Sequence, residues 1–109
     1  TLDLSHNNIE SAGALALLAE LPPKLEFLDL SENNLLDDGA RHFATLFPSL
    51  LCSKTIQEVD LRLNDLTDVC VKELPSHLFP HCPLLRILDV RGNSDTSGPT
   101  DAPLARLET

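Results

Sequence analysis

The residues best suited to hold a metal ion lie between positions 70 and 82. Cys70, His77, His81 and Cys82 carry thiol and imidazole groups, which are the preferred ligands of Zn²⁺. Their spacing, C-x6-H-x3-H-C, matches no common zinc motif, and two prolines interrupt the segment. We therefore predict ordinary core and surface roles for these side chains, with Cys70 in the core of a helix and no metal site.

A second candidate for chemistry is the adjacent carboxylate pair Asp37 and Asp38. Paired acids can act as a general acid and base, but these two stand at the start of a predicted helix. There they favour the positive end of the helix dipole, so helix capping is the better explanation. No serine lies in a nucleophile-elbow context, and the four glycines form no phosphate-binding loop. We predict that the chain is not an enzyme and has no cofactor.

The charge balance narrows the class of partner. Seventeen acidic residues against eight basic ones give a net charge of −9. Such a surface repels phosphate backbones and anionic lipids, so we expect no direct nucleic-acid or membrane ligand and favour a protein partner with a basic surface. The three cysteines have no paired spacing, which predicts reduced thiols in an intracellular, cytoplasmic protein. No apolar run is long enough to cross a bilayer.

One phrase recurs four times and must position any functional side chain. Where complete it reads L-x-x-L-x-L-x-x-N-x-L, with aliphatic substitutions. Its equivalent anchors are Leu2, Leu28, Val59 and Leu88, which are 26, 31 and 29 residues apart. Alternation within L-x-L predicts strands whose leucines face a core while the residues between them face outward. The predicted strand cores lie near residues 2–4, 27–30, 58–61 and 87–90.

Each predicted strand except the last is followed by a segment that is rich in helix formers. We expect helices over residues 11–21 and 37–47, and a third from Asp68 that Pro75 shortens or kinks. The third helix carries Cys70 where the first two have glycine.

These repeats resemble the leucine-rich repeat family, over roughly residues 1–93. The pattern N-x-[L/I]-x-[D/S]-x-G at residues 7–13 and 33–39, with the repeat length, is similar to the ribonuclease-inhibitor-like subclass. The resemblance implies an α/β solenoid with a parallel sheet on the concave face and helices on the convex face. It also implies that four buried amides bond backbone groups of adjacent turns: Asn7, Asn33, Asn64 and Asn93.

The ends of the predicted repeat region carry separate expectations. About three and a half to four repeats is close to the minimum for a stable stack, so we expect a fragment of a longer array or an N-terminal edge covered by a partner. Residues 94–109 are polar and rich in turn formers, which predicts an irregular or partly disordered C-terminal tail. Leu104 and Leu107 are candidates for docking onto the last repeat.

Stacked strands would bring equivalent outward residues into columns across the concave face. The candidate protein-binding residues are Asp3, Ser5, Phe27, Asp29, Ser31, Glu58, Asp60, Arg62, Ile87, Asp89 and Arg91. Carboxylates at strand spacing repel one another, and a lysine or arginine of a partner would relieve that repulsion, with Phe27 and Ile87 as exposed anchors. The alternative is that the aspartate belongs to a common repeat phrase and that Arg62 and Arg91 neutralise the column in place.

The leading functional hypothesis is a non-catalytic protein–protein interaction module, acting as a scaffold or subunit of a larger intracellular complex. The family resemblance suggests two alternatives. One is a GTPase-activating-protein-like regulator, since Arg62 and Arg91 lie near candidate loop positions. The other is the sensor repeats of a nucleotide-binding immune receptor.

Overall fold

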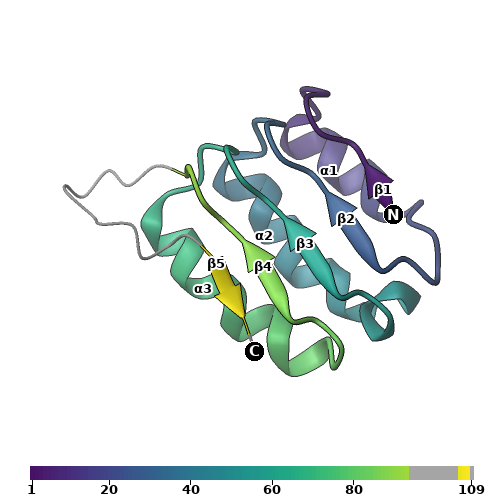
Figure 1. The fold of residues 1–109 in the computed structure, drawn as a ribbon. Helices are drawn as coiled ribbons and strands as arrows, with labels where there is room; N and C mark the ends of the chain where they lie inside the picture. Colours follow the sequence, from purple (N-terminus) through teal and green to yellow (C-terminus); the bar gives the residue numbers. More distant parts are fainter. Residues whose placement is uncertain (94–105, 109) are drawn as a thin grey trace.

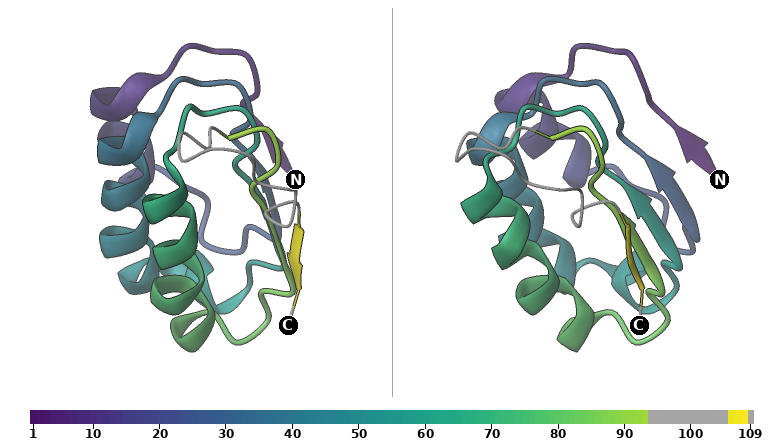
Figure 2. Two further views of the ribbon diagram at one scale, coloured as in Figure 1. Left: turned by 90° about the vertical axis from the view of Figure 1, so that its left-hand side faces the viewer. Right: turned by 60° about the vertical axis from the view of Figure 1, so that its left-hand side comes forward.

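Strands and helices alternate along the chain and form two layers. The computed structural model of the protein describes residues 1–93 and 106–108. Figure 1 shows a sheet with the helices packed behind it, and Figure 2 shows the two layers from the side. Up to residue 93 the elements are β1 (Leu2–Asp3), α1 (Glu10–Leu18), β2 (Phe27–Asp29), α2 (Leu36–Leu46), η1 (Phe47–Ser49), η2 (Leu51–Lys54), β3 (Glu58–Asp60), α3 (Asp68–Leu78), η3 (Phe79–His81) and β4 (Ile87–Asp89).

The four repeats stack in register. β1 to β4 are parallel and follow one another in chain order across the sheet. Leu2, Leu28, Val59 and Leu88 occupy equivalent positions on neighbouring strands. The prediction of an α/β solenoid with a parallel sheet is confirmed, and each strand begins and ends within about one residue of the predicted core. We call the sheet face that points away from the helices the concave face.

The core lies between the sheet and the helices. Leucines of the repeated phrase are buried there, with Leu28, Leu30 and Leu35 at most 2% exposed. On the helix side, the rings of Phe43 and Phe47 stack with centroids 4.6 Å apart. Burial of this aliphatic layer against neighbouring turns holds each repeat in place, because a single repeat has no core of its own.

Asparagine side chains join the turns that follow the strands. The Asn33 amide donates to the carbonyls of Leu4, Leu30 and Ser31, and its oxygen accepts from the N–H groups of Asn7 and Ile9. Asn64 and Asn93 repeat this bonding in the next two turns. The amide therefore satisfies backbone groups that the turns leave unpaired, as the family resemblance implies.

The third helix does not end at its proline. Pro75 lies inside α3, which continues to Leu78, so the expected shortening is wrong. Proline removes one helical hydrogen bond, at a cost of about 3 kcal/mol in a helix interior. Val71, Leu74 and Leu78 are buried against the core, and this packing holds the helix together across the missing bond.

The C-terminal segment adds a strand to the sheet. β5 (Arg106–Glu108) pairs antiparallel with β4, so these residues are not irregular as expected. Leu107 is the register partner of Leu88, which agrees with the expected docking of Leu107 onto the last repeat. Residues 94–105, including Leu104 and the turn position after Asn93, lie outside the described part of the chain.

Candidate functional site

The predicted aspartate column forms across the concave face. Asp3, Asp29, Asp60 and Asp89 are register partners on β1 to β4. Beside them, Phe27, Glu58 and Ile87 form a second row. The structure therefore brings the main candidate side chains together on one face.

Each aspartate of the column also organises its own turn. One oxygen of each carboxylate accepts a hydrogen bond from the backbone N–H two residues further on, at 2.9 to 3.2 Å. Such bonds satisfy the backbone where the chain leaves the strand. The repeated aspartate is therefore a structural residue as well as an acidic one.

In the first two repeats, the residue two positions after the aspartate is a serine. The Ser5 hydroxyl donates to Asp3 at 2.6 Å, and the Ser31 hydroxyl donates to Asp29 at 2.7 Å. Among the described residues, neither of these aspartates forms an ion pair. We call Asp3 and Asp29 the acidic half of the column.

In the last two repeats, the equivalent residue is an arginine. The Arg62 guanidinium lies 2.9 Å from Asp60, and that of Arg91 lies 2.7 Å from Asp89. We call these two aspartates the paired half. Their arginines neutralise the carboxylates in place, as the alternative interpretation expected, so the column is uniformly acidic in sequence but not in charge.

A hollow of about 180 Å³ lies on the concave face between the two halves. Among its lining residues are Asp29, Glu58, Asp60, Ile87 and Asp89. One further cation reaches this rim, because the Arg86 guanidinium lies 3.0 Å from Glu58. Sequence reasoning missed Arg86; its place directly before Ile87, at the start of a strand beside Glu58, was the available signal.

Three candidate side chains are less exposed than predicted. Ile87 is only 7% exposed, so its predicted role as an exposed anchor is wrong. It lies on β4, which has β3 on one side and β5 on the other. Ser31 and Asp89 are also buried, at 4% and 8% exposure, while Phe27 remains half-buried.

Burial and hydrogen bonds compete at the carboxylates. Burial by itself raises the pKa of Asp89, but the hydrogen bonds and charge of Arg91 outweigh it, and the net pKa is lowered. The pKa of Asp3 is lowered chiefly by the Ser5 hydroxyl and then by its backbone N–H. Both aspartates are therefore ionised at neutral pH.

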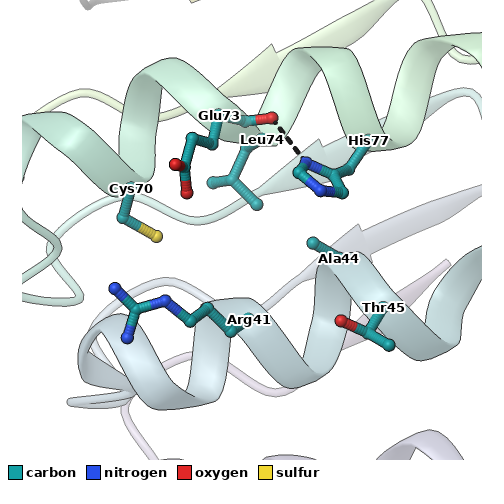
Figure 3. A pocket seen from close by; sticks show the side chains of 7 residues that line it. All are labelled: Arg41, Ala44, Thr45, Cys70, Glu73, Leu74 and His77. Carbon is teal, nitrogen blue, oxygen red and sulfur yellow. Dashed lines mark hydrogen bonds between the residues drawn. The ribbon is translucent and has the colours of Figure 1, made fainter.

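A second hollow, of about 200 Å³, lies between α2 and α3 on the convex side. Figure 3 shows Arg41, Ala44 and Thr45 on one helix facing Cys70, Glu73, Leu74 and His77 on the other. Between α1 and α2 the equivalent position is Gly39, where an added Cβ would lie 3.3 Å from the Ser11 Cα. Cys70 places a side chain where Gly39 lets two helices approach.

The model of the family described as "Leucine Rich repeat" matches residues 1–18, 22–44 and 52–74, which is more than half of the chain. The chain belongs to the leucine-rich repeat family. It is 37% identical over 89 residues to the Tonsoku-like protein of Mus musculus and 34% identical over 92 residues to that of Bos taurus. These alignments cover 80% and 83% of this chain but only 6% and 7% of the two relatives.

The zinc-like residues of this leucine-rich repeat chain do not converge on a shared site. Cys70 and Cys82 are buried in different elements, and His77 accepts or donates a hydrogen bond with the Glu73 carbonyl at 3.0 Å. Burial raises the pKa of Cys70 to about 12, helped by the charge of Asp37. Within the described ranges, no group of three or more His, Cys, Asp and Glu side chains is arranged to hold a metal ion.

The acid pair at the start of α2 links two repeats. No side chain caps the N-terminus of α2, so the predicted capping by Asp37 or Asp38 is wrong. Instead, Asp37 accepts hydrogen bonds from the backbone N–H and the hydroxyl of Thr67, at 2.9 and 2.7 Å. Thr67 is the residue directly before α3, so Asp37 ties the beginning of one repeat's helix to the next.

No helix in the described residues is both long enough and apolar enough to cross a membrane.

Proposed function

We propose that this leucine-rich repeat chain is a non-catalytic protein–protein interaction module that binds a basic segment of a partner through the acidic half of its concave face. The observation that carries this proposal is the state of Asp29. Its carboxylate lines the concave hollow and has no cationic partner among the described residues, whereas Asp60 and Asp89 are each paired with an arginine.

The surroundings of Asp29 suit a lysine or arginine side chain. Phe27 is half-buried on the same strand face and offers an apolar surface for the aliphatic part of such a side chain. Asp3 adds a second carboxylate one strand away. The paired half of the column offers less to a basic partner, because a new cation there must compete with Arg62 and Arg91.

The broader role that we propose is that of a scaffold or subunit in a larger intracellular complex. The relatives are much longer than the aligned region, so a module of this size forms a small part of a large protein in them. All three cysteines are free and buried, which agrees with a reducing compartment.

The GTPase-regulator hypothesis gains no support from the arginine geometry. Arg62 and Arg91 are held by carboxylates of their own turns, and either would have to break an ion pair to reach into a partner. No observation favours the immune-sensor hypothesis over the general one.

The test is a comparison of charge-neutral variants in affinity capture from cell extract. Asp3→Asn/Asp29→Asn removes two concave charges while keeping an oxygen that accepts the turn N–H. Asp38→Asn/Asp65→Asn removes two exposed charges away from the column; position 65 is equivalent to Asn8 and Asn34, so asparagine suits it.

For partners captured by the wild-type chain, we expect about a 10-fold loss of affinity in the concave variant and little change in the control. Equal binding by both variants, with both folded by circular dichroism, would remove the acidic half from the proposed function.

A further inference from the structure

The two edges of the sheet are chemically different. At one edge, β5 covers β4 in antiparallel pairing. At the other edge lies β1, and Figure 1 shows no element of the chain beyond it. The difference matters because each edge of a parallel stack carries one half of a repeating hydrogen-bond pattern.

That pattern runs in one direction. Each repeat offers acceptors to the repeat before it: the carbonyls of Asp29, Ser31 and Asn33 accept from N–H groups of the first repeat at 2.9 to 3.1 Å. The Asn33 side-chain oxygen accepts two more, at 2.8 and 3.3 Å. The next interface repeats this arrangement, with Asp60, Arg62 and Asn64 as the acceptor residues.

The same register leaves an acceptor row on the β1 edge. The carbonyls of Asp3, Ser5 and Asn7 occupy the positions of Asp29, Ser31 and Asn33 and therefore face away from β2. Within the described residues, the Asn7 amide nitrogen donates to the Leu4 and Ser5 carbonyls, while its side-chain oxygen has no donor.

An apolar surface accompanies the acceptor row. A hollow of about 420 Å³ lies beside the β1 edge, lined by Thr1, Leu2, Pro22, Pro23, Lys24 and Leu25. Leu2, Leu4 and Ile9 are only partly buried, whereas the equivalent residues of the second repeat are at most 2% exposed. Both the polar and the apolar halves of a repeat interface are thus present on this edge.

We propose that the β1 edge docks an additional leucine-rich repeat joined to the chain ahead of Thr1. Its strand would run parallel to β1, its turn would donate five N–H groups to the acceptor row, and its leucines would cover Leu2, Leu4 and Ile9. This inference does not rest on the proposed binding of a basic partner.

Two observations favour a repeat in the same chain over a second copy. Repeats one and two are joined by only residues 19–26 between helix and strand, so a directly connected repeat reaches its register without an association cost. A second copy stacked head to tail would have to present the edge of β4, and β5 already occupies that edge.

The test adds a duplicate of residues 1–26 directly ahead of Thr1 and follows amide hydrogen exchange by NMR. In the present chain, the Asn7 and Ile9 amides are bound by Asn33. We expect the same two amides of the duplicate to reach protection within about 10-fold of that level. Exchange of the duplicate's amides at the rate of an unfolded peptide would overturn the proposal.

A substitution at the original Asn7 provides the matched control. We expect Asn7→Ala to lower the ratio of folded to unfolded protein by less than about 5-fold in the present chain and by more than about 30-fold in the extended chain. Asn33→Ala should have the same large effect in both chains. An equal effect of Asn7→Ala in both chains would contradict docking at this edge.

Self-association distinguishes the other occupant. Sedimentation equilibrium of the present chain should show a monomer across the concentration range. A dimer that Asn7→Ala abolishes would assign the edge to a second copy and overturn the proposal of a directly joined repeat.

Discussion

At the scale of single residues, two polar positions of the repeated phrase have different roles. The asparagine is purely structural: it lies among backbone groups that have no other partner and bonds them across adjacent turns. The aspartate shares its carboxylate between a turn N–H and the concave surface. Specificity then depends on the residue two positions after it, serine in two repeats and arginine in the other two.

Removing one asparagine amide tests its structural role. Asn33→Ala leaves the Asn7 and Ile9 N–H groups and the Leu4 carbonyl without their partner, so we expect the free energy of unfolding to fall by about 3–5 kcal/mol. Urea denaturation measures this change. Asn34→Gly is the control, because Asn34 is exposed at a φ of 55° that glycine adopts freely, and it should cost less than about 1 kcal/mol.

The buried thiols predict an alkaline limit to stability. Burial raises the pKa of Cys82 to about 11 and, together with the Asp37 charge, that of Cys70 to about 12, from an ordinary value of 9.0. Above pH 9.0 the unfolded chain loses thiol protons that the folded chain keeps. Unfolding is therefore favoured, and stability should fall as the pH rises from there towards about 12.

Alkylation checks the same thiols directly. Iodoacetamide at pH 8 should leave the folded chain unmodified and label three cysteines after unfolding. A thiol that reacts in the folded chain as fast as free cysteine would contradict the burial of these side chains.

At the scale of elements, the sequence predicted what the repeated phrase determines and missed what separate segments supply. Strand positions and the inward leucines follow from alternation, and the asparagine bonds follow from the family resemblance. The burial of Ile87 was missed because the strand that flanks β4 comes from residues 106–108, which carry no repeat signal. Pro75 was misread because local propensity does not show that Val71, Leu74 and Leu78 pack against the core.

The link between α2 and α3 was also invisible in the sequence, because it joins side chains 30 residues apart. Asp37→Ala removes both bonds to Thr67, and we expect it to lower the free energy of unfolding by about 1–3 kcal/mol at pH 7. Asp38→Ala, at an exposed neighbouring position, should change it by less than about 0.5 kcal/mol.

Acid should erase this difference. Burial raises the pKa of Asp37, but the hydroxyl and N–H of Thr67 outweigh it, so the folded pKa lies below the ordinary value of 3.8. The contribution of Asp37 is therefore present above pH 3.8 and lost as the pH falls through the folded pKa. Thermal unfolding at several pH values should show wild type and Asp37→Ala converging in acid; a constant gap would contradict the role of the carboxylate.

At the scale of the whole molecule, charge and edges both run along the solenoid. The acidic half of the column lies at the end of the sheet with the acceptor row, and the paired half lies at the end covered by β5. A basic partner would thus meet uncompensated carboxylates over β1 and β2 and arginine-neutralised ones over β3 and β4. The net charge of −9 alone does not predict this division.

The most direct test of the proposed function is zero-length carbodiimide cross-linking of the chain to its captured partner, read out by mass spectrometry. This reagent joins carboxylates to lysines that are already in contact. We predict cross-links from partner lysines to Asp29 and Asp3, with few to Asp38 and Asp65. Cross-links confined to Asp38, Asp65 or other carboxylates outside the column would contradict the claim that the acidic half of the concave face binds the partner.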